Sequence, residues 1–247
     1  KDEVPKQFDY MNETGGPTGR TKDLYQFVRL YQYSDFITGE DGKLTLNPSL
    51  PQPSSAVSPG DAMYADLNGD NIVDGNDRFI TGYSNRPEYV FGLNMGCEWK
   101  GFSLSMQWTG ATHVNKMYEI EYRIPFTNSG NRGLLTYFYD ECWTPDNQLG
   151  AKYPRPSETS ESWNSSPSTL WLQDASYLRL KNLTVGYTIR NNDFLKKIGI
   201  NSLGITFSGY NLLTFTPMKY VDPESVTSNA GKYPLVKLYN FGLNLNF

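Results

Sequence analysis

The sequence predicts an all-β fold in which antiparallel strands form a segment of a transmembrane barrel. Five segments alternate apolar residues with small or polar ones, as expected for strands whose two faces meet different surroundings. No stretch approaches the roughly 18 consecutive apolar residues that a transmembrane helix needs. Only 38% of the 247 residues are hydrophobic, but a barrel wall needs an apolar residue only at every second position. The composition therefore suits a barrel.

The first distinctive element along the chain is an Asp-rich loop at residues 66–77. Counted from its first residue, side-chain oxygens fall at positions 1, 3, 5, 9 and 12, and a backbone carbonyl is available at position 7. This is the ligand spacing of an EF-hand-like calcium loop. The predicted ligands are Asp66, Asn68, Asp70, Ile72 through its carbonyl, Asp74 and Asp77. Asn71 replaces the usual glycine at position 6, and asparagine tolerates the left-handed conformation needed there.

Two interpretations of this loop stand side by side: a structural calcium clip, and an Asx-rich turn that holds no ion. Four carboxylates within twelve residues repel one another unless a cation is present, which favours calcium. The sequence on either side, residues 59–61 and 83–87, lacks the two helices of an EF-hand. We therefore predict a structural metal in a loop, and no calcium sensor.

The clearest hairpin consists of two alternating segments, residues 89–99 and 102–108, joined by Lys100-Gly101. A two-residue turn places its flanking residues opposite each other on the same face of the sheet. Trp99 and Phe102 flank the turn, and both are apolar. The alternation and the turn therefore predict the same register.

A third strand is predicted over residues 177–189. Leu178 and Leu180 have even numbers, whereas the apolar residues that follow have odd numbers, so a regular strand would place them on opposite faces. A bulge near Lys181-Asn182 would return them to the same face. One helical turn is expected between this strand and the next, over residues 192–198.

The last two predicted strands are residues 203–207 and the C-terminal segment 240–247. The C-terminal segment carries four apolar residues on one face, ending in Phe247, and only asparagine and glycine on the other. Aromatic residues also recur at the strand ends, as in the girdles of membrane barrels. Tyr89 and Trp108 would mark one rim, and Trp99, Phe102, Tyr187 and Phe247 the other.

Lengths favour a membrane barrel over a soluble sheet. The eleven residues 89–99 rise roughly 34 Å, or about 24 Å along the membrane normal at a tilt near 45°, and the apolar band of an outer-membrane barrel is about 25 Å tall. Short links and long connections also alternate, and such barrels keep their long loops outside the cell. We therefore expect residues 1–88, 109–176 and 214–234 to be extracellular, and residues 89–247 to supply the barrel strands. Five strands cannot close a barrel, so a larger wall is expected.

Other functional classes find little support. A net charge of −4 without a basic block argues against a nucleic-acid surface. Cys97 and Cys142 have no metal-site or disulfide-scaffold spacing. The single histidine, His113, has no nucleophile motif near it, and pairs such as Asp140-Glu141 are common in acidic chains. We predict no enzyme activity. The polar N-terminus, without a start methionine, suggests a piece of a longer protein.

Together these segments resemble the C-terminal quarter of a SusC/RagA-type TonB-dependent transporter of Bacteroidetes outer membranes. The resemblance rests on the order and spacing of short motifs over most of the chain. They are Gly60-Asp61, the loop 66–78, Arg86 to Gly92, Trp143 to Asn147, Tyr153 to Arg155, Ser168 to Leu172, Ser176 to Asn182, Gly186-Tyr187, Asn211 to Thr214 and Asp222 to Glu224. Cys142 departs from the family, which commonly has arginine before the Trp-Thr-Pro run.

The resemblance implies a 22-stranded barrel in the outer membrane, of which this chain would supply about the last five strands. It also implies partners: the remainder of the barrel with its N-terminal plug, a SusD-like surface lipoprotein, and TonB acting through the missing N-terminal part. Glycans or peptides would be the imported substrates. The terminal residues Asn240, Gly242, Leu245 and Phe247 resemble the signal that barrel-assembly machinery recognises.

Residues in the long loops are candidates for contact with a ligand or partner. They are Trp143, Asp146, Asn147, Tyr153, Arg155, Trp163 and Trp171. Such side chains could stack on sugars and hydrogen-bond to hydroxyl or peptide groups. Alternatively, the aromatic rings anchor the loops to one another. The second interpretation is favoured, because long ordered loops need apolar anchors of their own.

A rival fold from another functional class is a secreted, calcium-stabilised β-sandwich that binds carbohydrate or mediates adhesion. It would share the alternating strands, the Asp-rich loop and the exposed aromatic residues. The two interpretations differ in what covers the apolar face of the strands: a second sheet in the sandwich, and lipid in the barrel.

Overall fold

The computed structural model describes residues 6–16, 19–126, 133–156, 162–190, 192–225 and 235–247. They form two compact units. The sheet unit comprises the described residues of 87–114, 174–225 and 235–247, and the loop unit those of 6–86 and 115–173.

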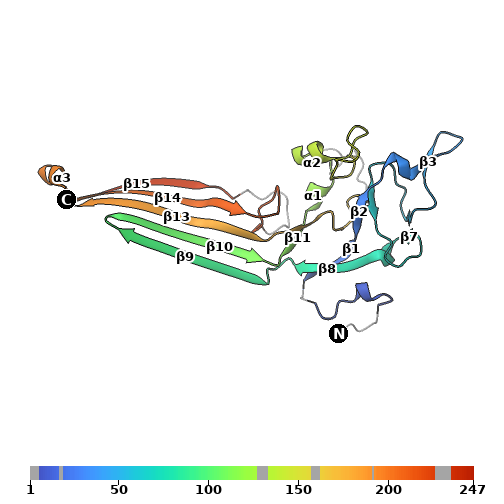
Figure 1. Cartoon of the computed structure of the whole chain (residues 1–247), viewed down its shortest axis with the longest axis horizontal. Helices are drawn as coiled ribbons and strands as arrows, with labels where there is room; N and C mark the ends of the chain where they lie inside the picture. Colours follow the sequence, from blue (N-terminus) through green and yellow to red (C-terminus); the bar gives the residue numbers. More distant parts are fainter. Residues whose placement is uncertain (1–5, 17–18, 127–132, 157–161, 191, 226–234) are drawn as a thin grey trace. The chain divides into compact units, whose positions relative to one another are not determined.

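The sheet unit is built on one five-stranded antiparallel sheet with the order β15-β14-β13-β10-β9. Figure 1 shows these long strands side by side. Their bounds are β9 Tyr89–Trp99, β10 Phe102–Thr112, β13 Tyr177–Arg190, β14 Ser202–Phe215 and β15 Leu238–Asn246. This sheet confirms the predicted all-β class. Strands β10 and β14 extend beyond their predicted ends at 108 and 207, because their later residues keep pairing with β13 although their apolar alternation fades.

The β9–β10 hairpin has the predicted register, with Trp99 opposite Phe102. Both turn residues take positive φ angles, 47° at Lys100 and 89° at Gly101, as a two-residue type I′ turn requires. A Cβ atom on Gly101 would lie 2.4 Å from the Thr188 carbonyl oxygen of the neighbouring strand. The turn therefore depends on glycine for its backbone conformation and for its close approach to β13.

The predicted bulge lies in β13 at Lys181. The pairing of β13 with β10 shifts between Asn182 and Leu180, and its pairing with β14 shifts at the same place. The shift returns Leu180 to the face that carries Leu183, because one extra residue reverses the alternation. The phase change in the sequence is thus confirmed as a bulge.

One face of the sheet is apolar and exposed. Register places Trp99, Ile205 and Phe241 on this face together with most of the other large apolar residues of the five strands. Phe241 is 83% exposed and Leu243 63%. The opposite face carries small and polar residues, among them Asn94, Ser105, Thr184, Thr206 and Asn244. Within the described residues of the sheet unit, most of the large side chains of this face are exposed.

The links at one end of the sheet are short. There the Lys100-Gly101 turn joins β9 to β10, and the link between β13 and β14 carries the single-turn helix α3, Asp193–Lys197. The helix agrees with the turn predicted over 192–198. The C-terminus lies at the same end (Figure 1). No helix in the described ranges has the length and apolarity needed to cross a membrane.

The loop unit consists of short paired strands and helical turns. The strands are β1 Arg20–Tyr25, β2 Phe27–Leu30, β3 Phe36–Thr38, β4 Leu44–Leu46, β5 Gln52–Pro53, β6 Ala62–Tyr64, β7 Ile72–Val73, β8 Arg78–Ser84, β11 Asn115–Met117 and β12 Leu172–Asp174. The helical turns are η1 Asp9–Met11, η2 Tyr33–Asp35, η3 Gly75–Asp77, α1 Ile120–Arg123 and α2 Thr136–Glu141. The strands pair as β1-β8, β2-β6, β3-β4, β5-β7 and β11-β12. The sequence predicted only loops here. Eight of these strands have two to four residues, too few to show alternation, and the pairing of the longer β1 and β8 is interrupted by register shifts.

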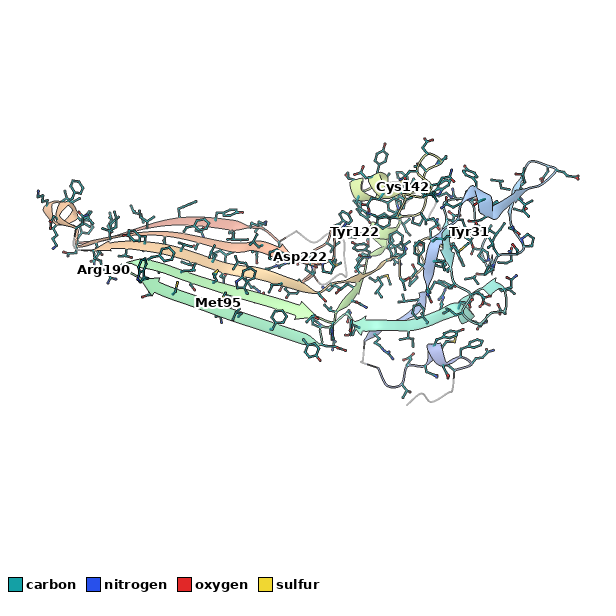
Figure 2. The ribbon with its side chains drawn as sticks, viewed as in Figure 1. Tyr31, Met95, Tyr122, Cys142, Arg190 and Asp222 are labelled. Carbon is teal, nitrogen blue, oxygen red and sulfur yellow. The ribbon has the colours of Figure 1, made fainter. Side chains whose placement is uncertain are left out.

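Buried residues from distant loops form the core of the loop unit. Tyr25, Tyr64 and Trp163 pack together around Ala62 and Val73. The rings of Tyr25 and Tyr64 are stacked with their centroids 4.9 Å apart. A second cluster joins Tyr31, which Figure 2 labels, with Phe36 and Met63. The long loops are therefore held together by their own aromatic core.

Candidate functional site

The Asp-rich loop is closed by its last carboxylate, Asp77, which is buried. One Asp77 oxygen accepts from the backbone N–H groups of Leu67 (2.7 Å) and Asn68 (3.3 Å), and the other accepts from the N–H of Asp74 (2.8 Å). The residue at position 12 therefore draws the start and the end of the loop together, as the position-12 residue does in an EF-hand-like loop.

The other predicted ligands of the loop form local turns. Asp66 accepts from the N–H groups of Gly69 (2.7 Å) and Asn71 (2.8 Å), and Asp70 accepts from the N–H of Ile72 (2.8 Å). The φ angle of Asn71 is 65°, so Asn71 adopts the left-handed conformation expected at position 6. These bonds preorganise the loop backbone. Asn68 and Asp74 make equivalent bonds to the N–H groups of Asp70 and Asn76.

The loop offers oxygen donors only, which is the donor chemistry that calcium prefers. Each carboxylate oxygen that accepts one N–H keeps a second lone pair for a cation. In the described residues, however, no three acidic, histidine or cysteine side chains lie close enough together to bind a metal ion. The structure thus shows the loop conformation and donor types of a calcium site without a converged set of carboxylates.

Tyr10 lies against this loop, and its hydroxyl donates to the Asn76 carbonyl at 2.6 Å. The pKa of Tyr10 is raised, first by partial burial and then by the negative charge of Asp77, Asp66, Asp70 and Asp74. All four carboxylates therefore contribute to the electrostatic field at one phenol.

The four predicted aromatic contact residues lie in the interior of the loop unit. Trp143, Tyr153, Trp163 and Trp171 are all buried. Trp163 donates through its indole N–H to the Ala62 carbonyl at 2.9 Å, and Trp171 donates to the Asn164 carbonyl at 2.9 Å. The ring of Trp171 stacks on that of Tyr153 with a centroid distance of 5.5 Å. The anchoring interpretation therefore describes these rings, and we propose no stacking on a ligand for them.

Arg155 likewise has an internal partner. Its Nε atom donates to Asp61 at 2.8 Å, and the Asn164 amide donates to the same carboxylate oxygen at 2.9 Å. Asp61 is buried, and the backbone N–H of Arg155 donates to the carbonyl of Gly60, which precedes Asp61. A buried carboxylate needs such partners because an unpaired buried charge is costly. The structure thus assigns Arg155 to loop anchoring.

Asp146 is exposed and Asn147 is partly exposed. Both lie in a turn that lines an open surface depression of about 540 Å³. Gln32 and Ser34 line the same depression. Of the seven predicted contact residues, only this pair remains a candidate for direct ligand contact.

The four residues of the predicted assembly signal lie in or just after β15. Asn240 and Gly242 lie on the polar face, opposite Ser208 and Thr206, whereas Leu245 lies opposite Leu203 on the apolar face. Phe247 follows the strand and is exposed. A Cβ atom on Gly242 would lie 2.4 Å from Thr206 Oγ1, so only glycine fits beside Thr206 without a rearrangement.

Comparison with known proteins finds similarity to TonB-dependent receptors. No family model matches the chain. TonB-dependent receptor P3 of Formosa agariphila is 28% identical over 236 residues, which span 90% of this chain and 22% of the receptor. TonB-dependent receptor P26 of the same organism is 28% identical over 202 residues, 76% of this chain and 20% of the receptor.

Solved structures agree with these relatives. The RagAB peptide transporter matches with a TM-score of 0.58 and 20% identity over 91% of this chain and 22% of that chain. The chain is similar to SusC/RagA-type TonB-dependent transporters. It spans about a fifth of the length of the curated relatives. The five-stranded sheet is accordingly a partial barrel segment, in agreement with the predicted fold class.

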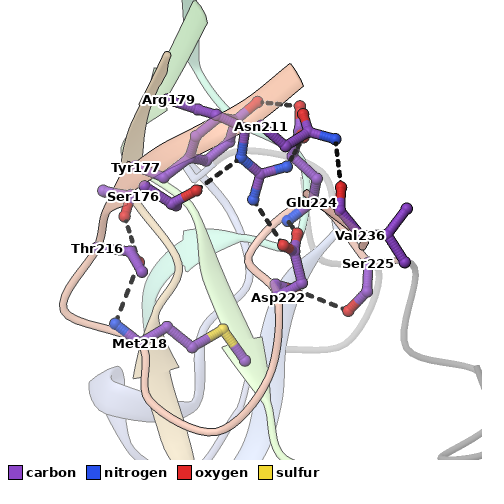
Figure 3. Close-up of polar contacts among 11 residues, drawn as sticks. Ser176, Tyr177, Arg179, Asn211, Thr216, Met218, Asp222, Glu224, Ser225 and Val236 are labelled. Atoms are coloured by element: carbon purple, nitrogen blue, oxygen red, sulfur yellow. Dashed lines mark hydrogen bonds and ion pairs between the residues drawn. The ribbon is translucent and has the colours of Figure 1, made fainter. Parts of the chain in front are cut away.

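The sequence did not predict one polar cluster on the sheet, which Figure 3 shows. Arg179 of β13 is 1% exposed and faces the polar side of the sheet. Its guanidinium donates to Asp222 at 2.6 Å, to Glu224, and to Thr214 Oγ1 at 3.0 Å. Tyr177 donates to the other oxygen of Glu224 at 2.7 Å. These bonds tie the segment after β14 to β13.

The sequence did contain a signal for this cluster. Arg179 is a charged residue at a strand position whose neighbours on the same face are hydroxyl or amide residues, so it needs an anionic partner. The motif Asp222-Pro223-Glu224 offers two carboxylates in the next connection. The pairing itself spans more than 40 positions, and nothing in the sequence alone marks it.

Proposed function

We propose that this chain forms part of the wall, the lumen surface and the extracellular loops of an outer-membrane TonB-dependent importer. The importer would take up glycans or peptides together with a SusD-like surface lipoprotein. The observation that carries the proposal is that the sheet has two different faces. One face is apolar and exposed, and the opposite face carries hydroxyl, amide and glycine residues. A barrel wall needs these two faces, because one meets lipid and the other meets water.

The energetics of the apolar face support lipid as its environment. Leaving a large apolar side chain in water instead of burying it costs about 1.5–3 kcal/mol, and all five strands carry such residues. A β-sandwich would cover this face with a second sheet. Because no described element of the sheet unit covers it, the sandwich alternative lacks its defining layer.

The sheet edges support a requirement for more strands. Strands β9 and β15 each pair on one side only in the described sheet. An unpaired edge in lipid leaves backbone N–H and C=O groups without partners, at several kcal/mol for each group. We propose that the remainder of the same barrel pairs with both edges and contributes the plug and the TonB contact. The C-terminal residues Asn240, Gly242, Leu245 and Phe247 would engage the barrel-assembly machinery.

The names of the relatives describe receptors and importers, and we propose no catalytic role. Asp146 and Asn147, in their open depression, are proposed as contacts for the imported ligand or the lipoprotein. The experiment for this pair is alanine substitution in the full-length transporter. Reduced ligand uptake or lipoprotein retention is expected, and unchanged values for both would exclude the assignment.

The barrel-wall proposal is tested by thiol labelling of two adjacent residues of β14. Ile205→Cys lies on the apolar face and Thr206→Cys on the polar face, in full-length protein that carries Cys97→Ala because Cys97 is exposed. In outer-membrane vesicles we expect a water-soluble maleimide to label position 206 many times faster than position 205. Equal labelling rates, or recovery of the protein in the aqueous fraction without detergent, would contradict the proposal.

We also propose that the loop 66–77 binds one calcium ion as a structural clip. Its oxygen donors and preformed turns support the proposal, and ion binding would draw the carboxylates together. Asp70→Ala removes a ligand from an exposed position, and Asp146→Ala serves as a carboxylate control outside the loop. We expect the full-length protein to lose one bound calcium and its stabilisation by the metal, about 2.7 kcal/mol at a calcium concentration 100 times Kd. Unchanged calcium content and melting in Asp70→Ala would exclude the site.

A further inference from the structure

The helix α3 forms a well-defined turn at the end of the sheet where the short links lie. Asn192 caps its start, accepting from the N–H groups of Phe194 (2.9 Å) and Leu195 (3.4 Å). Gly199 follows its end with a φ of 77°, and its N–H donates to the Lys196 carbonyl. A turn with both ends capped holds its side chains in defined directions.

This turn exposes two apolar side chains. Phe194 is 69% exposed and Ile198 is 54% exposed, whereas Leu195 between them is buried. Residues four positions apart lie on the same side of a helical turn. Phe194 and Ile198 therefore form one exposed apolar face, whereas Leu195 points away from it.

Four cationic side chains lie at this end of the sheet. Lys196 and Lys197 of the turn are exposed. Arg190, labelled in Figure 2, and Lys100 line an adjacent depression of about 590 Å³ between the end of β13 and the β9–β10 turn, together with the exposed ring of Trp99. The Lys100 ammonium lies 5.0 Å from the centroid of that ring, within the range of a cation–π contact.

The charges at this end of the sheet do not balance. The acidic side chains on the same turn and in the same depression are Asp193 and Glu98. The turn and the depression together therefore carry four cationic and two acidic side chains, so positive side-chain charge is in excess beside aromatic rings. A phospholipid interface combines phosphate groups with the ends of acyl chains, and it complements both features.

We propose that this rim surface, formed by Lys100, Arg190, Phe194, Lys196, Lys197 and Ile198, binds phospholipid head groups and anchors the end of the sheet in the membrane interface. Phe194 and Ile198 insert beside the acyl chains, and the four cations contact head-group phosphates. The apolar face of the sheet reaches this end through Tyr187 and Ile189, so the rim surface continues the lipid-facing surface. The inference rests on the proposed barrel wall.

Nitroxide labels at three positions test the depth of the turn. Full-length transporter in phospholipid vesicles, with Cys97→Ala, carries a label at Phe194→Cys, at its exposed neighbour Asp193→Cys, or at Ile205→Cys on the apolar face. We expect position 194 to contact dissolved oxygen in preference to a water-soluble nickel chelate, as position 205 does, and position 193 to show the reverse. If position 205 reports lipid and position 194 reports water, the rim inference fails alone. If position 205 also reports water, the barrel-wall proposal fails.

The preference for phosphate is tested by lipid retention. Native mass spectrometry compares phosphatidylglycerol with phosphatidylcholine bound to the full-length protein and to the double variant Lys196→Gln, Lys197→Gln. We expect the ratio of anionic to zwitterionic lipid to fall about fivefold for each cation removed. The control Lys6→Gln, Lys43→Gln alters two exposed lysines of the loop unit and should keep the wild-type ratio. An unchanged ratio in the rim variant would overturn the role of the cations.

Discussion

Replacing Arg179 by methionine should release the segment after β14 from β13. The guanidinium is 1% exposed and holds Asp222 at 2.6 Å, Glu224 and the Thr214 hydroxyl. Methionine fills much of the same volume but leaves two carboxylates facing each other without a cation. We therefore expect the free energy of opening this segment to fall.

The magnitude follows from the burial of the partners. Removing one member of a fully buried ion pair costs about 3–5 kcal/mol. The Asp222 and Glu224 side chains keep 23% and 28% of their exposure, so they regain part of their hydration when the segment moves. We expect a loss of about 2 kcal/mol, equivalent to a roughly 30-fold larger equilibrium constant for local opening.

Hydrogen–deuterium exchange of the full-length protein measures this opening. The relevant amides are those of Glu224, which donates to Asp222 Oδ1, and Ser225, which donates to the Asp222 carbonyl. Asp222→Asn should have a smaller effect, because Arg179 keeps Glu224 and Thr214. The two substitutions combined should cost less than the sum of the single effects, since both act on one network.

Lys181→Met provides the matched control, since it removes an exposed cation two positions along the same strand. Exchange at residues 216–225 should be unaffected in this variant. If Arg179→Met leaves these amides as protected as in the wild type, the cluster does not hold the segment and the reasoning is wrong.

Three further predictions concern single residues of the two units. Arg29 holds the pKa of the Asp35 carboxyl below its usual value, mainly through its hydrogen bonds. The stability from this pair is therefore complete above about pH 4, the unfolded pKa, and is lost as the pH falls through the folded pKa. Asp35→Asn should weaken the protection of the Gln32 amide against hydrogen exchange by about 1 kcal/mol near pH 7. In strong acid the variant and the wild type should be equally protected. A difference that persists there would refute the stabilising role of the Arg29–Asp35 pair. Trp171→Leu should destabilise the loop unit by about 3 kcal/mol in melting experiments, whereas Tyr139→Leu, at an exposed ring, should change little; equal effects would contradict the anchoring role. Gly101→Ala should lower the melting temperature of the barrel in detergent more than Gly199→Ala, because both glycines have positive φ but only Gly101 lies against a neighbouring carbonyl; the opposite order would argue against the close approach.

Much of the sheet unit could be predicted because its signals are local. The β9–β10 hairpin follows from alternation on both sides of Lys100-Gly101, and the bulge at Lys181 follows from a change of phase within one strand. The Asp-rich loop is local as well, since all the hydrogen bonds described above among its own residues lie within twelve positions. Its left-handed Asn71 was expected from sequence alone.

The roles of the candidate contact residues could not be predicted from local sequence patterns. Trp143, Trp163 and Trp171 were recognisable as loop aromatics, but their burial depends on partners far along the chain. Trp163 donates to Ala62, 101 positions away, and Arg155 pairs with Asp61, 94 positions away. The sequence does not distinguish an exposed aromatic residue from one that anchors a loop. Only the tertiary structure shows which of them is buried.

By itself, the sequence determined which face of each long strand is apolar, because successive side chains of a strand point to opposite faces and the pattern repeats every two residues. It also determined the donor chemistry of the loop 66–77. The tertiary structure decided which loop residues anchor and which stay accessible, and it brought Arg179 to Asp222 and Glu224. These pairings join segments that are far apart in the chain, and no periodic pattern in the sequence relates such segments. The pairings therefore depend on the packing of the folded chain.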